Sequence, residues 1–289
     1  MKLATSCMNV TFSKETNLAK YLTYIDQAAQ EGAKLIVFPE QSLQGYLPSL
    51  INLEMSTFDH QYANAEVVPD GPSTQTLIKK AKETDMHIIF GMTEQDADDY
   101  CTLYNSMVLI GPDGYIGKYR KVHQPIDELH IYTGGTEFPV YDTAIGKIGM
   151  LICYDKAFPE ATREMAVQGA ELLVMSTAWP FENPDGNLEE DLMMKQYNLY
   201  DQVRALENQC FFISSNHSGT SGTITYVGHS RITSPSGVEL ACTGFGEGIA
   251  YADVDVRAEV IKGRTHGMIG LNLLRDRVPA AYSHIGAEK

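Results

Sequence analysis

Residues 146–163 have the sequence GKIGMLICYDKAFPEATR, in which a short apolar run leads to a cysteine and then to a helix start. The run Ile148–Ile152 predicts a buried strand that ends directly before Cys153. Phe158–Pro159 predicts the beginning of a helix, because proline at a first helical position loses no hydrogen bond. Free amides and the helix dipole favour negative charge at such a junction, so we expect a lowered pKa for the Cys153 thiol. Cys153 is a candidate nucleophile, although most single cysteines are simply buried in a core.

The N-terminal part of the chain shows a similar order of strand, helix and strand. Leu3–Val10 predicts a strand, and Thr16–Gln30 predicts a helix with one apolar face. Lys34–Phe38 is a nearly continuous run of apolar β-formers, which is typical of a strand buried on both faces. Glu40 follows this strand, at the kind of strand end where sites form in α/β proteins. A helix cap or a solvated turn would also explain a glutamate there.

Further strands and helices continue this alternation. Helices are predicted at Ser73–Thr84, Leu192–Glu207 and Val256–Lys262, and strands at His87–Thr93, Leu103–Ile110, Tyr115–Arg120, Glu171–Ser176, Cys210–Ser214, Ile224–Thr233, Val238–Ala241 and Gly248–Val254. The repetition predicts an α/β fold in which two sheets pack face to face with helices outside. We expect a single domain over residues 1–289, with a core over about residues 2–277 and a C-terminal tail over residues 278–289.

Three further candidates occupy strand ends or the loops that follow them. Lys121 directly follows the second arm of a predicted hairpin, and Glu128 lies in the loop Gln124–Phe138, which is long enough to cover a site. Each residue by itself would be an ordinary surface charge. Trp179, the single tryptophan, follows a predicted buried strand and would serve either as core or as a pocket wall.

Composition excludes several classes of protein. The net charge of −15 and the absence of clustered Lys and Arg argue against nucleic-acid binding. The N-terminus has no secretory-signal pattern, and no apolar run approaches the roughly 18 residues of a membrane span. The five cysteines are scattered without a C-x-x-C pair, which favours a reducing compartment without structural zinc or a disulfide framework. We therefore expect a cytoplasmic protein that does not act at a membrane.

Several motifs along the chain together resemble those of the nitrilase superfamily of carbon–nitrogen hydrolases. They are Phe38-Pro39-Glu40, Tyr119-Arg120-Lys121-Val122-His123, Gly149 to Asp155 continuing through Phe158-Pro159-Glu160 to Arg163, Arg204 to Asn208, and Gly228 to Ile232 with Pro235 and Gly237. Because they span nearly the whole chain, the resemblance is specific.

The resemblance implies a four-layer α-β-β-α sandwich that assembles as a homodimer or a larger homo-oligomer. The catalytic glutamate, lysine and cysteine of the family fall on Glu40, Lys121 and Cys153, and a second glutamate falls on Glu128. Glu40 would act as general base and acid, Lys121 would stabilise an oxyanion, and Cys153 would form a thioester. Glu128 would orient Lys121 or the substrate, and neither a metal nor an organic cofactor is required.

The residues after Cys153 favour one branch of the superfamily. Tyr154-Asp155 resembles amidases and carbamoyl hydrolases, whereas true nitrilases typically have Cys-Trp-Glu at this point. We therefore expect hydrolysis of a small amide or N-carbamoyl compound, with nitrile hydrolysis as the alternative. The predicted substrate-binding residues are Tyr46, Tyr154, Trp179 and His217.

Three other interpretations stay open at the level of sequence. A non-catalytic binding protein would have no reason to keep both glutamates, the lysine and the cysteine together. A metal or redox protein lacks a ligand set among the eight histidines and five cysteines. A papain-type hydrolase would use His123 or His217 as the base for Cys153.

Overall fold

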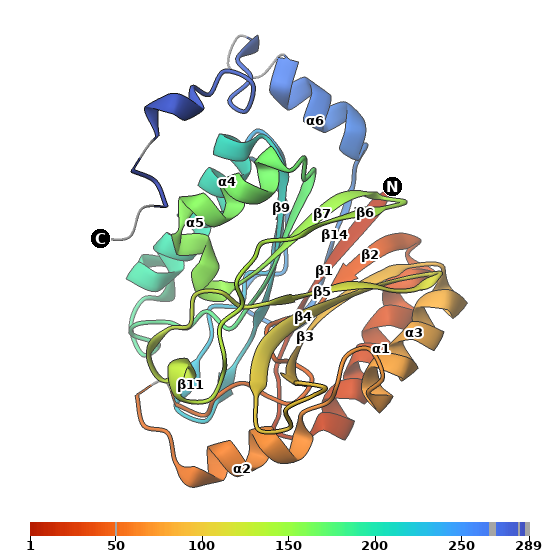
Figure 1. Ribbon diagram of the computed structural model, residues 1–289, viewed down its shortest axis with the longest axis vertical. Helices are drawn as coiled ribbons and strands as arrows, with labels where there is room; N and C mark the ends of the chain where they lie inside the picture. The colour runs from red at the N-terminus through yellow and green to blue at the C-terminus, as the bar shows by residue number, and fades with distance from the viewer. Residues whose placement is uncertain (50, 266–269, 283, 287–289) are drawn as a thin grey trace.

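The computed structural model describes residues 1–49, 51–265, 270–282 and 284–286 (Figure 1). Its main sheet follows the strand order β5-β4-β3-β2-β1-β9-β8-β7-β6, with β12, β13 and β14 attached beside this path. Helices lie on both sides of the strands, so that the strands form the two inner layers of the molecule (Figure 1). The predicted α-β-β-α arrangement is confirmed.

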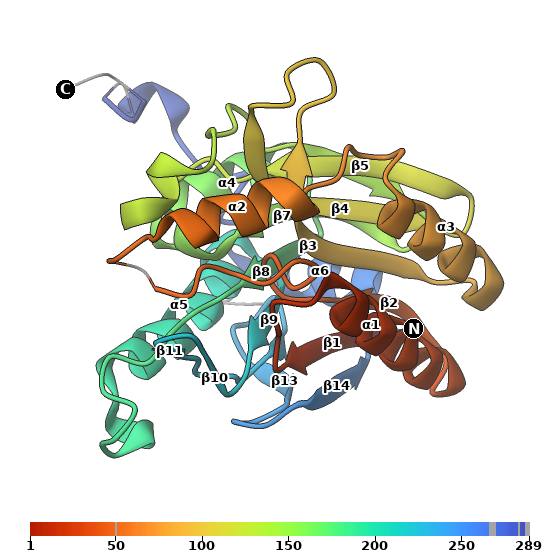
Figure 2. The same cartoon turned by 90° about the horizontal axis from the view of Figure 1, so that it is seen from below.

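The first half of the sheet contains five strands and is covered by two helices. The strands are β1 Lys2–Met8, β2 Ala33–Val37, β3 His87–Gln95, β4 Leu103–Gly111 and β5 Gly114–Arg120, and the helices are α1 Lys14–Gln30 and α3 Pro72–Thr84. α1 and α3 pack beside each other on one outer face (Figure 2). Ile36 packs outward with Tyr21 and Leu77 of these helices, whereas Leu35 and Val37 face the second half, as alternation along a strand requires.

The second half contains four strands and is covered by two other helices. The strands are β6 Val140–Thr143, β7 Gly146–Ile152, β8 Leu172–Thr177 and β9 Phe211–His217, and the helices are α4 Pro159–Val167 and α5 Leu192–Asn208. α4 packs on β7 and β8, and α5 packs on β9. Strand β6 was not predicted, because its sequence VYDT is short and only partly buried.

The two halves are continuous rather than separate sheets. β1 pairs in parallel with β9 through Cys7 with Asn216 and Met8 with His217. The strands then fold over so that side chains of both halves share one core, which includes Leu35 and Ile89 from the first half and Met150 from the second. The expectation of two face-to-face layers is correct, but hydrogen bonds between β1 and β9 join them.

The remaining elements surround the ends and edges of this sheet. They are α2 Met55–Asn64, β10 Thr220–Ser221, β11 Ile224–Thr225, β12 Arg231–Thr233, β13 Glu239–Cys242, β14 Gly248–Asp253, α6 Val256–Thr265, and the 3-10 helices η1 Ile126–His130, η2 Cys153–Ala157, η3 Leu188–Glu190 and η5 Pro279–Ala281. The single strand predicted over Ile224–Thr233 is divided, because Gly228 and His229 have φ angles of 67° and 51°, which no strand adopts. Within the predicted tail, residues 283 and 287–289 lie outside the described part of the chain. Over the described ranges, none of the helices is both long enough and apolar enough to cross a membrane.

The strand directions define where a site can form. Strands β2, β1, β9, β8 and β7 are all parallel to one another. Their carboxyl ends therefore lie along the same edge of the sheet. Glu40, His217, Thr177 and Cys153 each lie at or just beyond one of these ends. Four residues that are far apart in sequence thus meet at one edge.

Candidate active site

Glu40 lies just beyond the end of β2 and is completely buried. Its backbone runs so close to Gly91 of β3 that a Cβ atom at Gly91 would lie 2.7 Å from the Glu40 Cα and 2.5 Å from the Pro39 carbonyl oxygen. Only glycine leaves room for this approach. The Glu40 carboxylate accepts hydrogen bonds from Asn105 Nδ2 at 2.7 Å and from the Ala178 amide at 2.8 Å. These bonds hold the carboxylate at the edge of the sheet.

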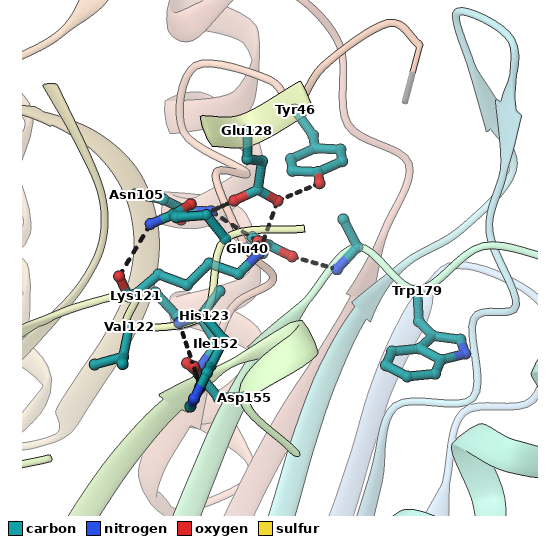
Figure 3. Close-up of polar contacts among 12 residues, drawn as sticks. Glu40, Tyr46, Asn105, Lys121, Val122, His123, Glu128, Ile152, Asp155 and Trp179 are labelled. Carbon is teal, nitrogen blue, oxygen red and sulfur yellow. Dashed lines mark hydrogen bonds and ion pairs between the residues drawn. The ribbon is translucent and has the colours of Figure 1, made fainter. Parts of the chain in front are cut away.

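Lys121 follows β5 and is also completely buried. Its Nζ atom lies 2.6 Å from Glu40 Oε1 and 2.7 Å from Glu128 Oε1 (Figure 3). Burial by itself would lower the pKa of Lys121, but the charges of Glu128 and Glu40 outweigh it and raise the pKa above its ordinary value. Lys121 is therefore a permanent cation, and one of its three N–H donors stays free of the two carboxylates.

Glu128 belongs to the 3-10 helix η1 and completes this cluster of charges. Its carboxylate accepts hydrogen bonds from Tyr46 Oη at 2.5 Å and from Asn105 Nδ2 at 3.2 Å, besides that from Lys121 (Figure 3). Burial raises the pKa of Glu128 to about 7, although Lys121 acts in the opposite direction. The loop predicted to cover a site thus contributes a buried carboxylate to it.

Replacing Glu128 with glutamine is expected to flatten the pH dependence of stability. The folded-state pKa of about 7 is raised above the ordinary 4.5, so the folded protein binds this proton more tightly than the unfolded chain does. The stability contributed by this carboxyl is fully present below pH 4.5 and is lost as the pH rises through about 7. Urea unfolding between about pH 5 and about pH 8 measures this loss. Glu83→Gln, at an exposed position, serves as the control, and a Glu128→Gln protein with the same pH slope as the native protein would contradict the assignment.

Cys153 follows β7 and begins the 3-10 helix η2. Its φ of 48° is uncommon for a residue other than glycine and marks backbone strain of the kind found at functional sites. The residue is 7% exposed, whereas Glu40 and Lys121 are not exposed at all, so Cys153 is the member of the cluster that solvent reaches.

The thiol of Cys153 is not acidic. Burial is the main cause that raises its pKa, to about 12, and the negative charge of Glu40 adds to this effect against the opposing charge of Lys121. The predicted lowering of this pKa is therefore wrong. The α4 helix begins only at Pro159, after the intervening 3-10 turn, and its dipole acts mainly within its first turn. A protonated thiol needs a base beside it, and the Glu40 carboxylate can serve as one.

Asp155 connects the turn that carries the nucleophile to the segment that carries Lys121. Its Oδ2 atom accepts hydrogen bonds from the Ile152 amide at 2.9 Å and from Tyr119 Oη at 2.6 Å. Its Oδ1 atom accepts from the His123 amide at 3.0 Å and lies 2.8 Å from His123 Nδ1 (Figure 3). One carboxylate therefore fixes Cys153 relative to Lys121.

A second buried ion pair fixes η2 against α5. Lys156 Nζ lies 2.9 Å from Asp201 Oδ1 and contacts the faces of two aromatic rings, at 3.6 Å from the Tyr197 centroid and 4.4 Å from the Trp179 centroid. Arg204 Nε donates a hydrogen bond to the Lys156 carbonyl at 2.8 Å. Burial lowers the pKa of Lys156 to about 8. These contacts position the turn rather than supply further reactive groups to the cluster.

The four predicted substrate-binding residues have different surroundings. Tyr46 and His217 are buried beside the cluster: Tyr46 bonds to Glu128, and His217 Nε2 lies 2.6 Å from the Glu40 carbonyl oxygen. The Trp179 indole donates to the Met193 carbonyl at 3.0 Å and lies apart from the carboxylates (Figure 3). Tyr154 is 40% exposed, and its ring contacts that of Phe158. The structure therefore brings two of the four side chains to the cluster.

The histidines are poorly suited to act as the base for Cys153. Burial lowers the pKa of His217 to about 4, so its imidazole is a weak base. The His123 ring is engaged by Asp155 and stacks on Phe158 with a centroid distance of 3.7 Å. The papain-type interpretation therefore receives no support from the surroundings of either ring.

Sequence reasoning missed three contributors to the site. Asn105 bonds to both glutamates, and its signal is an amide side chain within the largely buried strand Leu103–Gly111. Ala178 contributes only its backbone amide, and a pattern of side chains cannot predict such a contribution. Tyr226 lies in a segment that pairs with the residues after β8, through the bridge between Pro180 and Tyr226. This pairing depends on long-range contacts that local patterns do not reveal.

Comparison with known proteins identifies a family and several relatives of this chain. Residues 2–262 match the family model described as carbon-nitrogen hydrolase. The chain is 30% identical over 269 residues to the omega-amidase NIT2 of Homo sapiens, with 89% of each chain covered. It is 32% identical over 266 residues to the 2-oxoglutaramate amidase of Bacillus subtilis, with 89% of this chain and 92% of that protein covered. It is also 34% identical over 244 residues to the probable nitrilase C965.09 of Schizosaccharomyces pombe, with 83% of each covered.

Among solved structures, the fold is similar to that of an amidase from Nesterenkonia sp. AN1. The two structures agree with a TM-score of 0.77 at 21% sequence identity, and the match covers 99% of both chains.

Proposed function

Because the chain belongs to the carbon-nitrogen hydrolase family and is an amidase-type member of it, we propose that Cys153, Glu40 and Lys121 hydrolyse a small amide or N-carbamoyl compound. One observation carries this assignment of roles. A buried lysine joins two buried carboxylates beside a thiol whose pKa is raised, so the thiol is paired with a base and an oxyanion-binding cation.

The first half of the reaction forms a thioester. Glu40 removes the proton from Cys153 as the sulfur attacks the amide carbon, and the free N–H donor of Lys121 stabilises the oxyanion that results. A backbone amide at Cys153 or Tyr154 is a second donor for that oxyanion. When the carbon–nitrogen bond breaks, Glu40 returns the proton to the departing nitrogen, which leaves as ammonia or an amine.

The second half of the reaction releases the acid. Glu40 takes a proton from water, whose oxygen attacks the thioester carbon, and the sulfur leaves and recovers the proton. Glu128 holds Lys121 in place through both halves. Its position is in turn held by the Tyr46 hydroxyl.

A panel of amides, N-carbamoyl compounds and nitriles, scored by ammonia release, tests this function. We expect the amides or carbamoyl compounds to be hydrolysed and the nitriles to react slowly. Nitrile hydrolysis is kept as the second candidate because one of the relatives reported above bears the name nitrilase. Turnover confined to nitriles would replace the proposed function with that alternative.

The setting of the reaction is also part of the proposal. We infer action in the cytoplasm as a homodimer or larger homo-oligomer, on a small molecule. All five cysteines are free, which suits a reducing compartment. Val167 on α4 and Leu199 and Leu206 on α5 are exposed apolar side chains, and such a face favours association with another copy. Light scattering after size-exclusion chromatography measures the assembly.

A further inference from the structure

Two buried polar side chains beside the cluster have no part in the reaction steps above. His217 lies at the end of β9, and Tyr226 lies just after β11. Their ring centroids are 4.7 Å apart, and the Tyr46 ring lies 6.3 Å from that of His217. Burial raises the pKa of Tyr226, and the charges of Glu40 and Cys153 add to this effect, so the hydroxyl lies within electrostatic reach of the base and the nucleophile.

The hydrogen bond of His217 determines which of its nitrogens is an acceptor. Nε2 lies 2.6 Å from the Glu40 carbonyl oxygen, which can only accept, so Nε2 carries the proton. Burial lowers the pKa of His217 to about 4, and the ring is neutral near pH 7. Nδ1 therefore presents a lone pair, and only a group that donates a hydrogen bond can satisfy it.

Tyr226 is held by its backbone rather than by its hydroxyl. The Phe181 amide donates to the Thr225 carbonyl at 2.8 Å, and the Val227 amide donates to the Trp179 carbonyl at 3.0 Å. These bonds attach the Tyr226 segment to the chain that follows β8. The hydroxyl itself is buried and bonds to no residue that the structure describes.

Neither His217 Nδ1 nor Tyr226 Oη has a hydrogen-bond partner among the residues that the structure describes. Leaving a buried polar atom without a partner lowers stability, so folded proteins rarely leave such atoms without a ligand or water to satisfy them. We propose, on the basis of the hydrolase function above, that His217 and Tyr226 form a substrate subsite for a group that donates a hydrogen bond and carries no negative charge. A second carboxamide or a ureido group has this chemistry.

The charges at the site act against a carboxylate in the same position. Burial is the main cause of the raised pKa of Cys153, and Glu40 and Glu128 both add to it, so the carboxylates impose a negative potential there. The opposing cation, Lys121, is already bonded to both of them. A carboxylate would meet this potential and would also leave His217 Nδ1 unsatisfied, since it has no proton to donate.

Matched amides that differ only at the far end test the subsite. Succinamide ends in a carboxamide, succinamate in a carboxylate, and pentanamide in an alkyl group, and homologues one carbon shorter and longer cover differences in reach. At each productive length we expect kcat/KM for the diamide to exceed that for the alkyl amide by about 10-fold after correction for its two equivalent ends. The carboxylate should be the poorest substrate.

Equal rates for the diamide and alkyl amide, or a preference for the carboxylate, would overturn the subsite but leave amide hydrolysis intact. Failure of every amide and every N-carbamoyl compound would instead reject the proposed function.

Tyr226→Phe provides the decisive variant. It removes a hydroxyl that bonds to nothing in the described part of the chain, so the protein should fold normally. We expect the preference for the diamide over the alkyl amide to fall by about 5-fold to 10-fold, mainly through a higher KM for the diamide. Tyr100→Phe, at a side chain that is 76% exposed, should keep the full preference. A Tyr226→Phe protein that loses activity equally on both substrates would show a structural role only and would refute the subsite.

Discussion

Replacing Cys153 with alanine is expected to reduce amide hydrolysis on the order of 10⁵-fold, because nothing else in the cluster can form the acyl intermediate. Glu40 and Lys121 would stay in place, since Asn105 and Glu128 hold them independently of the thiol. The loss should therefore fall on kcat, and substrate should still bind. Steady-state ammonia release measures the rate, and calorimetry measures substrate binding to the inactive protein.

Two controls distinguish the loss of the nucleophile from damage to the fold. Cys101→Ala changes an exposed cysteine and should keep full activity. Intact-mass measurement with a slowly hydrolysed substrate should detect an acyl adduct on the native protein and none on Cys153→Ala. A Cys153→Ala protein that keeps more than about one hundredth of native turnover would remove Cys153 from the mechanism.

Replacing Glu40 with glutamine is expected to lower kcat by about 10³-fold. Burial and the charge of Glu40 raise the pKa of Cys153 to about 12, so at neutral pH the thiol must lose its proton to a base during attack. Glutamine keeps the shape of the side chain but cannot accept that proton or return it to the leaving nitrogen. Both formation and hydrolysis of the thioester should therefore slow.

A matched buried carboxylate provides the control for this variant. Glu66 is 5% exposed and lies 3.0 Å from Lys14, away from the catalytic cluster, so Glu66→Gln removes a comparable buried charge. We expect it to lower stability but to keep most of the turnover of the folded protein. The Cys153→Ala and Glu40→Gln changes should also be non-additive, because both act on the same step. Full additivity in the double variant would contradict a shared role.

Local sequence patterns predicted the elements well where burial follows a simple period. The continuous apolar run at Lys34–Phe38 became β2 Ala33–Val37, and the run before Cys153 became β7 Gly146–Ile152. The local patterns gave wrong predictions where the backbone conformation depends on contacts with distant parts of the chain. The backbone at Gly228 and His229 divides a predicted strand, and the 3-10 turn η2 separates Cys153 from the helix that was expected to act on its thiol.

The sequence by itself predicted the α/β layering, because strand periodicity is a local property of the chain. Its resemblance to the nitrilase superfamily identified Glu40, Lys121, Cys153 and Glu128 as candidates. Only the tertiary structure decided their electrostatics. The pKa values of a thiol and a carboxyl depend on burial and on charges supplied by other strands and loops. The same long-range packing leaves His217 Nδ1 and Tyr226 Oη without hydrogen-bond partners among the described residues. The sequence does not reveal this, because the groups that surround each atom are brought together only when the chain folds.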